Sequence, residues 1–239
     1  EEGAAAEPGG VGIKPRQISA QERAMAGAAQ GDIFDVVALT SDQLQPSSDV
    51  LKAVQDVRTQ SLAGDWSGRF RAVTAARTLV AHHPTVFDGV QRDGEGENGD
   101  PRLLGLVVSL VASAASDKRS VVQTNRLRCM AELFSCDVGA GLNADEMGAL
   151  VEVALACQKL TAKVPKDESE KAMDAAVANA NLVLLLNSIL PQAREKHPKV
   201  ADRAVLYVDE CLSRLEVGDV PGNGMPDGVD VKSLLLGLA

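Results

Sequence analysis

The chain has 239 residues and a formal net charge of -9, and hydrophobic residues make up 45% of it while aromatic residues make up only 3%. So few aromatic residues argue against an all-β fold, because strands favour aromatic and β-branched side chains. No apolar run reaches the roughly 18 residues that a membrane-spanning helix needs, and the first residues, Glu1 and Glu2, are acidic where a signal peptide is basic. We therefore expect a helical, cytoplasmic protein.

The negative charge is concentrated near the two ends of the chain. Residues 1–49 carry a net charge of -5 and residues 216–239 carry -3, whereas residues 50–215 carry only -1. A nearly neutral body can still present a basic surface if its lysines and arginines gather on one side. The total charge therefore does not exclude an acidic protein partner.

Three regions follow one another along the chain. Residues 1–46 are rich in Ala, Gly and Glu and are predicted to be an N-terminal tail, with a short helix near 21–30 and an apolar stretch at 33–39 that docks on the body. Residues 47–216 have apolar side chains at helical spacing and form the predicted domain. Residues 217–239 are predicted to be a Gly- and Pro-rich linker followed by a short apolar terminal helix.

Helix start and stop patterns divide the central region into eight predicted helices. Asn143 with Glu146, and Asp167 with Glu170, have the spacing of capping boxes, in which a side chain at each end satisfies a free N–H group. The helices are expected at about 48–63, 67–82, 101–114, 119–135, 144–160, 168–180, 182–195 and 199–215. They form pairs that recur about every 40 residues, which is the period of HEAT and armadillo repeats. The sequence therefore predicts an all-α fold, an α-solenoid of antiparallel HEAT-like helix pairs.

No set of residues has the pattern of an active site. Residues 94–99, GEGENG, match the spacing G-x-G-x-x-G, but they lie between predicted helices and carry two glutamates that would repel a phosphate. His82 and His83 end a helix, where a cation opposes the helix dipole. The four cysteines have no metal-ligand spacing and are expected to be buried and reduced. We expect no enzymatic activity, no cofactor and no metal site.

The turns within the helix pairs have a more distinctive composition. In an array of antiparallel pairs these turns, at 64–69, 116–120, 161–166 and 196–199, lie on one edge. That edge combines the only tryptophan, Trp66, with a row of basic residues, namely Lys118, Arg119, Lys163, Lys166, Lys196 and Lys199. An aromatic residue beside cations is typical of an interface with an acidic protein surface. The alternative is that Trp66 packs between helices and the lysines are ordinary solvated residues.

Three stretches in this region resemble a TOG domain, most closely that of the crescerin group of ciliary TOG-array proteins. The first is Asp65-Trp66 with Arg69, Leu79 and His83-Pro84. The second is Arg119-Ser120-x-Val122, leading into the sequence AELF at 131–134. The third is AMDAAV at 172–177, followed by Asn179. The resemblance runs from about residue 49 to residue 215.

The resemblance implies a binding function without catalysis. TOG domains are paddles of HEAT repeats that bind the αβ-tubulin dimer through the turns on one edge, so this chain is expected to bind tubulin or microtubules and to support microtubule assembly or stability in a cilium. The implied tubulin-binding residues are Trp66, Arg69, Lys118, Arg119, Val122, Lys163, Lys166, Lys196 and Lys199. The implied protein is a monomer, or part of a longer multi-TOG protein, with no nucleic-acid or membrane partner.

The sequence departs from the TOG pattern in two respects and leaves a second function open. The third turn is long and carries Pro165, so that either Lys163 or Lys166 takes the basic position of that turn. A complete TOG domain has six HEAT pairs, whereas four are predicted here, so the surface that faces α-tubulin is expected to be shortened. The alternative function is a HEAT-repeat scaffold that binds a partner other than tubulin, through its concave face or through the apolar residues Leu234, Leu235, Leu236 and Leu238.

Overall fold

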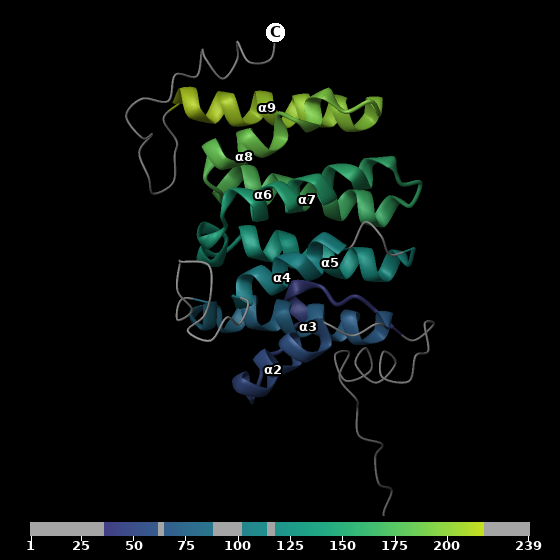
Figure 1. Cartoon of the computed structure of the whole chain (residues 1–239), viewed down its shortest axis with the longest axis vertical. Helices are drawn as coiled ribbons and strands as arrows, with labels where there is room; N and C mark the ends of the chain where they lie inside the picture. The colour runs from purple at the N-terminus through teal and green to yellow at the C-terminus, as the bar shows by residue number, and fades with distance from the viewer. Residues whose placement is uncertain (1–35, 62–64, 88–101, 114–117, 218–239) are drawn as a thin grey trace, which may run out of the picture.

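The structure of the protein is a computed structural model that describes residues 36–61, 65–87, 102–113 and 118–217. Within these ranges the chain forms helices and no strand, which confirms the predicted all-α fold class (Figure 1). Each of the eight predicted helices is present. They are α2 (Val50–Ser61), α3 (Trp66–His82), α4 (Leu103–Ala112), α5 (Ser120–Phe134), α6 (Ala144–Ala156), α7 (Lys163–Asn179), α8 (Leu182–Ile189) and α9 (Pro198–Val217).

Short 3-10 helices lie between or beside these elements. They are η1 (Ser41–Gln43), η2 (Pro84–Phe87), η4 (Asp137–Gly141), η5 (Cys157–Lys159) and η6 (Gln192–Arg194). The predicted fifth helix, 144–160, therefore consists of α6 and η5, and the predicted seventh, 182–195, consists of α8 and η6 with a short turn between them. Tightening of the last turn into a 3-10 helix is common at helix ends.

The helices form two layers that stack along the long axis of the molecule (Figure 1). In the first layer α3 contacts α5, α5 contacts α7, and α7 contacts α9; in the second layer α2, α4, α6 and α8 contact one another in the same order. One continuous cluster of buried apolar side chains joins the two layers over the whole stack. Because each helix buries its apolar face against neighbouring helices, the structure is stabilised along its whole length by contacts between neighbours.

The four helices of the first layer run in the same direction. Arg77 of α3 contacts Glu132 of α5 near the ends of both helices, while Trp66 and Arg119 meet at their starts. Phe134 of α5 lies beside Asn179 and Ala180 at the end of α7. In the last step, Glu170 of α7 contacts Arg203 of α9, and further along the helices Arg214 donates a hydrogen bond to the carbonyl oxygen of Val177. The starts of α3, α5, α7 and α9 therefore lie on one edge.

One predicted capping box is present and the other is wrong. The Asn143 side chain accepts a hydrogen bond from the Glu146 N–H at 2.9 Å, and a Glu146 carboxylate oxygen accepts one from the Asn143 N–H at 3.0 Å. Asp167 does not begin a helix, because α7 already begins at Lys163. Pro165 falls within the first turn, where the backbone N–H groups have no helical partner and a proline costs nothing.

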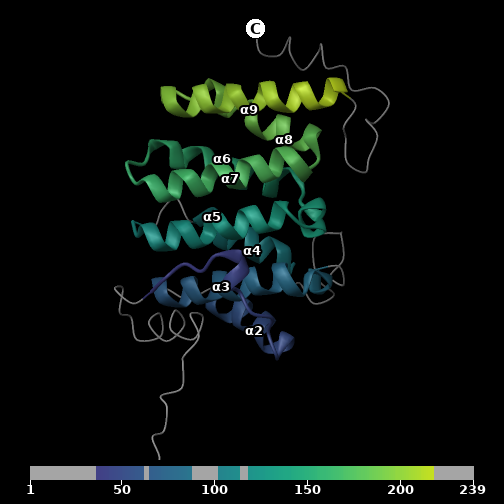
Figure 2. The ribbon, with the colours of Figure 1, turned by 180° about the vertical axis from the view of Figure 1, so that it is seen from behind.

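The described chain begins before the predicted domain boundary. Residues 36–44, which the sequence assigns to the N-terminal tail, cross the outer face of the first layer over α3 and α5 (Figure 2). Val36, Leu39 and Leu44 are each at most 6% exposed. A boundary at residue 46 therefore falls after a segment that packs on the body. The predicted helix near 21–30, the GEGENG sequence and the terminal region 218–239 lie outside the described residues.

All four cysteines are free, and their thiols are shielded to different extents. Cys129, Cys157 and Cys211 are buried, whereas Cys136 is half-buried. Burial raises the pKa of the Cys157 thiol to about 11 and that of Cys211 to about 12. Thiols with such pKa values stay protonated near neutral pH and are weak nucleophiles.

Among the described residues, no helix is long and apolar enough to span a lipid bilayer.

Candidate functional site

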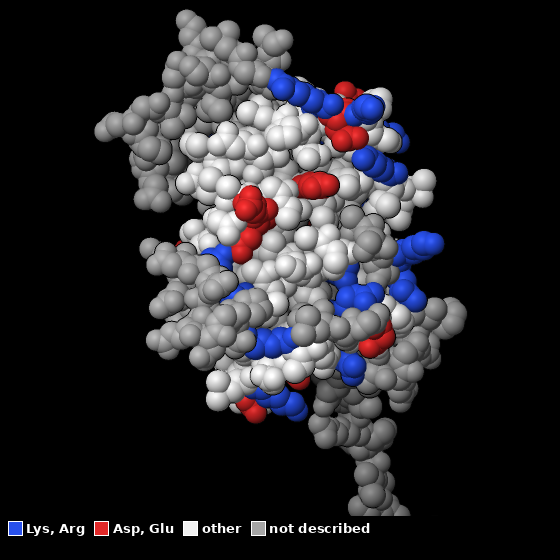
Figure 3. All heavy atoms as spheres, in the orientation of Figure 1, with Lys and Arg blue, Asp and Glu red and all other residues white. Residues whose placement is uncertain are grey.

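The edge at the starts of α3, α5, α7 and α9 carries most of the predicted site residues. We call it the basic edge. Figure 3 shows lysine and arginine side chains along this edge, at the right of the molecule, with a few acidic side chains between them. The basic edge contains Trp66 and Arg69 of α3, Lys118 and Arg119 before α5, Lys163 and Lys166 of α7, and Lys196 and Lys199 at the start of α9.

Trp66 is the first residue of α3, and a local cap fixes its place. The Asp65 carboxylate accepts hydrogen bonds from the Gly68 N–H at 2.7 Å and from the Ser67 hydroxyl at 2.5 Å. These bonds, first that of Ser67 and then that of Gly68, lower the pKa of Asp65 below its ordinary value. The N-cap therefore remains ionised near neutral pH, and it starts the helix at the tryptophan.

The Trp66 ring is held between a cation and a small apolar cluster. The guanidinium of Arg119 lies over the ring, with its Cζ atom 4.9 Å from the ring centroid, which is the geometry of a cation–π interaction. On the protein side, Trp66 packs against a cluster of buried residues formed by Val36, Phe70 and Val122. The ring itself is only partly buried, so part of it faces the solvent at the basic edge.

Val122 does not lie on the surface, which corrects its predicted role. Its side chain is 0% exposed and belongs to the inner part of the cluster under Trp66. The resemblance to a TOG domain implied a contact role for it, in the second turn with Lys118 and Arg119. In α5, however, it points toward α3 and the N-terminal segment, so it supports Trp66 from below instead of contacting a partner.

The cations of the basic edge lie where a helix normally prefers acidic residues. The first turns of α3, α5, α7 and α9 contain no acidic residue. In the second layer, Asp145 and Glu146 occupy the first turn of α6, whereas the first turns of α2, α4 and α8 also contain no acidic residue. A cation near a helix N-terminus opposes the helix dipole and costs about 0.3–1 kcal/mol. Lys163 and Lys199 are exposed in such first turns, so helix stability does not explain their presence.

Acidic residues also lie close to the basic edge. Glu170 and Glu168 are in the second turn of α7, and each pairs with a basic residue of the first layer: Glu170 with Arg203 at 3.2 Å and Glu168 with Arg128 at 3.0 Å. These carboxylates therefore neutralise arginines that join the helices. Asp65, Asp167 and Asp202 are exposed at or near the same helix starts, so a partner would meet the exposed lysines together with a few carboxylates.

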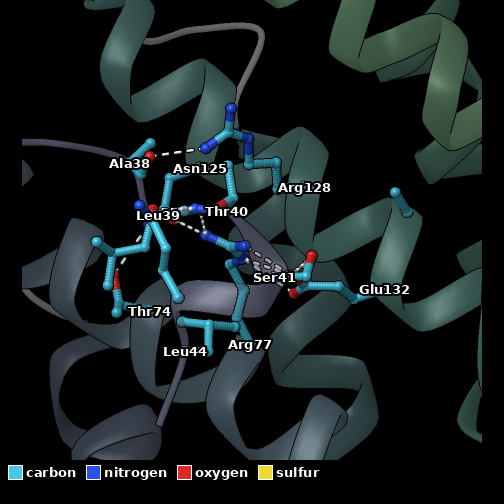
Figure 4. Close-up of polar contacts among 12 residues, drawn as sticks. Ala38, Leu39, Thr40, Ser41, Leu44, Thr74, Arg77, Asn125, Arg128 and Glu132 are labelled. Atoms are coloured by element: carbon cyan, nitrogen blue, oxygen red, sulfur yellow. Dashed lines mark hydrogen bonds and ion pairs between the residues drawn. The ribbon is translucent and has the colours of Figure 1, made fainter. Parts of the chain in front are cut away.

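A buried ionic network lies further along α3 and α5, and sequence reasoning missed it (Figure 4). Arg77, which is 0% exposed, donates hydrogen bonds to both carboxylate oxygens of Glu132, with the shortest at 2.6 Å. Its Nη1 atom also donates to the Asn125 side chain at 2.9 Å and to the Leu39 carbonyl oxygen at 2.7 Å. Such a network fixes α3, α5 and the N-terminal segment relative to one another.

One sequence feature does point to this network. Arg77 falls on the apolar face of its helix, four residues after Val73 and three before Val80, both of which are buried. A charged residue at a core position requires a buried partner of opposite charge. The sequence does not specify which acid is that partner, because Glu132 belongs to a distant helix.

Arg128 forms a second link between the same elements. Its Nη1 atom donates a hydrogen bond to the Ala38 carbonyl oxygen at 2.7 Å, and its Nη2 atom donates one to Glu168 of α7 at 3.0 Å. Lys171 also lies 3.3 Å from Glu168. Burial alone would raise the pKa of Glu168, but the hydrogen bonds and charges of Arg128 and Lys171 lower it below its ordinary value.

Comparisons with known proteins do not assign the chain. No family model, no curated protein and no solved structure matches it.

In the part of the chain that the structure describes, no group of three or more His, Cys, Asp or Glu side chains could hold a metal ion. His82 ends α3 with its Nε2 atom 3.2 Å from the Leu44 carbonyl oxygen, and the backbone N–H of His83 donates to the Leu79 carbonyl oxygen at 2.8 Å.

Proposed function

We propose that the protein is a tubulin-binding module, a TOG-like array of four HEAT-like helix pairs that binds the acidic surface of tubulin through the basic edge. In this proposal it supports microtubule assembly or stability, and a cilium is its place of action. The observation that carries the proposal is the composition of the edge: four parallel helices begin there with cations in or next to first turns that hold no acidic residue, beside a partly exposed tryptophan. Asp65, the N-cap of α3, is an acidic residue just before one of these turns.

The basic edge has two components with different roles in binding. Trp66 offers aromatic surface, which is typical of the few residues that dominate the free energy of an interface. The exposed lysines, among them Lys118, Lys163 and Lys199, attract an acidic partner over a distance and accelerate association. Cations placed against the helix dipole lower the stability of the fold, and a binding role accounts for their being there.

The experiment is a binding titration of the full chain with αβ-tubulin dimer, measured by analytical gel filtration and by fluorescence anisotropy of a labelled chain. We expect binding at low salt that weakens as the ionic strength rises from about 50 mM to about 300 mM, because exposed charges are screened over about 6–14 Å in that range. Trp66→Ala should weaken binding by about 2 kcal/mol. The double variant Lys163→Glu/Lys199→Glu should weaken it by about tenfold at low salt and less at high salt.

Lys52→Glu is the matched control. Lys52 is also an exposed lysine in the first turn of a helix, but that helix is α2 in the second layer. This variant should bind tubulin like the parent. If the chain fails to bind tubulin at low salt, or if Lys52→Glu and the edge variant weaken binding equally, the proposed function is wrong.

A scaffold function is the second candidate, and one observation favours it. Val205 and Leu206 of α9, the last described helix of the stack, are 54% and 57% exposed. Such side chains offer an apolar contact for a partner other than tubulin at this end of the array. Removing residues 218–239 and replacing Val205 and Leu206 with Ser would abolish the binding of such a partner, whereas tubulin binding at the basic edge would persist.

A further inference from the structure

We propose that Val36, a residue of the N-terminal segment, is a positioning residue for the basic edge. It completes the apolar cluster against which the Trp66 ring packs, and it thereby helps to keep the guanidinium of Arg119 over that ring. The expected effect of Val36 on the affinity for tubulin rests on the proposed function. Its expected effect on the orientation of the Trp66 side chain does not, and can be tested without tubulin.

The first step in the argument is the fixed register of the N-terminal segment. Arg128 holds the carbonyl oxygen of Ala38, and Arg77 holds that of the next residue, Leu39, each at 2.7 Å (Figure 4). The Ser41 hydroxyl donates a hydrogen bond to Glu132 at 2.7 Å. Three contacts with α3 and α5 within four residues leave the segment little freedom to slide along the groove between these helices.

The second step is the direction of the segment. Val36 lies in one cluster with Phe70 near the start of α3, the Leu39 carbonyl oxygen accepts a hydrogen bond from Arg77 in the second half of the helix, and the Leu44 carbonyl oxygen lies 3.2 Å from His82 Nε2 at its end. The segment therefore runs along α3 in the same direction as the helix (Figure 2). Given this register, Val36 reaches the start of α3, where Trp66 begins the helix at the basic edge.

The third step is the position of Val36 within the cluster. Val36, Phe70 and Val122 are its buried members, at 6%, 1% and 0% exposure, whereas Trp66 and Val121 pack on them and stay partly exposed. Val36 is therefore one of the three buried side chains of the cluster against which the Trp66 ring packs. A support of this kind restricts the ring to the orientation in which Arg119 lies over it.

Loss of the Val36 side chain should therefore change the edge more than the fold. The large core cluster does not include Val36, and the buried contacts of Leu39 and Leu44 belong to another part of the segment. In Val36→Ala two methyl groups are removed from the cluster, and the Trp66 ring can adopt more than one orientation. Binding must then order the ring again, and ordering one side chain of this kind weakens binding by about two- to tenfold.

The protein offers a direct probe and a matched control for this proposal. Trp66 is the only tryptophan in the chain, so the intrinsic tryptophan emission reports on this one site. Val37 is the same residue type at the neighbouring position, and its side chain is 58% exposed. The experiment compares Val36→Ala, Val37→Ala and the conservative variant Val36→Ile in the full chain. It records far-ultraviolet circular dichroism, acrylamide quenching of Trp66 and affinity for tubulin dimer.

We expect Val36→Ala to keep its helical circular dichroism, to show stronger quenching of Trp66 and to bind tubulin about two- to tenfold more weakly. Val37→Ala should match the parent in all three measurements, and Val36→Ile should restore both the quenching and the affinity. Unchanged quenching in Val36→Ala would overturn the inference, and so would loss of its helical signal, because Val36 would then be a residue required for folding. If quenching changes while neither the parent nor any variant binds tubulin, the positioning of Trp66 stands and the proposed function fails.

Discussion

The guanidinium of Arg119 lies over the indole ring of Trp66, although the two residues belong to different helices and to distant parts of the sequence. The contact exists because α3 and α5 lie side by side and run in the same direction, which brings the first residue of one helix next to the N-cap residue of the other. The aromatic residue and one of the cations of the basic edge therefore act as a single unit.

The stacked pair predicts a difference between arginine and lysine at position 119. Arg119→Lys keeps the charge but loses the planar group that covers the ring. We expect stronger acrylamide quenching of Trp66, a nearly unchanged melting temperature and weaker tubulin binding. Lys118→Arg is the control, because Lys118 is exposed beside this pair and the change again keeps the charge. Equal quenching in the parent and in Arg119→Lys would show that the arginine does not shield the ring.

Charge reversal at Lys199 should have opposite effects on stability and on binding. Glutamate in the first turn of α9 would interact favourably with the helix dipole and with Arg203 four residues later, so the free energy of unfolding should rise by about 0.3–1 kcal/mol. The same change removes a cation from the basic edge and should weaken tubulin binding at low salt. Urea denaturation and a tubulin titration on the same sample measure the two effects. A loss of stability in Lys199→Glu would mean that the lysine has a structural role.

Breaking the buried ion pair between Arg77 and Glu132 should strongly destabilise the protein. Arg77→Met leaves the Glu132 carboxylate without its buried partner, and removal of one member of such a pair costs about 3–5 kcal/mol. In the double variant Arg77→Met/Glu132→Met the loss should be smaller than the sum of the two single losses, since no charge is left unpaired. Urea denaturation measures all three.

A solvent-exposed pair provides the comparison for this prediction. Lys159 and Glu195 lie 3.7 Å apart with side chains that are 43% and 41% exposed, so Lys159→Ala should cost at most about 1 kcal/mol. Similar losses for Arg77→Met and Lys159→Ala would contradict the interpretation of the Arg77 network as a buried structural link.

The Glu168 carboxylate should make the stability depend on pH in the acid range. Arg128 and Lys171 lower its pKa in the folded protein below the value of 4.5 that it has when unfolded. Its contribution to stability is therefore present above the unfolded pKa and is lost as the pH falls through the folded pKa. Between about pH 6 and about pH 3 the parent should lose more stability than Glu168→Gln, which cannot titrate at this position. Parallel pH profiles of the two proteins would exclude this role.

The sequence alone determined the elements that depend on neighbouring residues. Apolar spacing located all eight helices, and the capping box at Asn143 and Glu146 formed as expected, because its donors and acceptors are three residues apart. The predicted start of α7, at residue 168, was five residues too late. The spacing of Asp167 and Glu170 indicated that start, whereas the helix begins at Lys163, because the first turn of a helix accepts a proline such as Pro165. The described residues of the predicted turns lie on one edge, and that edge contains Trp66 and the predicted cations.

Only the tertiary structure decided how distant segments meet. The exposure of Val122 depends on which face of α5 turns toward α3, and the partners of Arg77 depend on the parallel packing of these helices. The sequence predicted that the apolar stretch at 33–39 docks on the body, and the buried side chains of Val36 and Leu39 agree with that prediction. The path of residues 36–44 over α3 and α5 could not be predicted, because a short segment with three buried side chains has no regular period. Its place is determined by carbonyl contacts with Arg77 and Arg128, which form only after α3 and α5 have packed together.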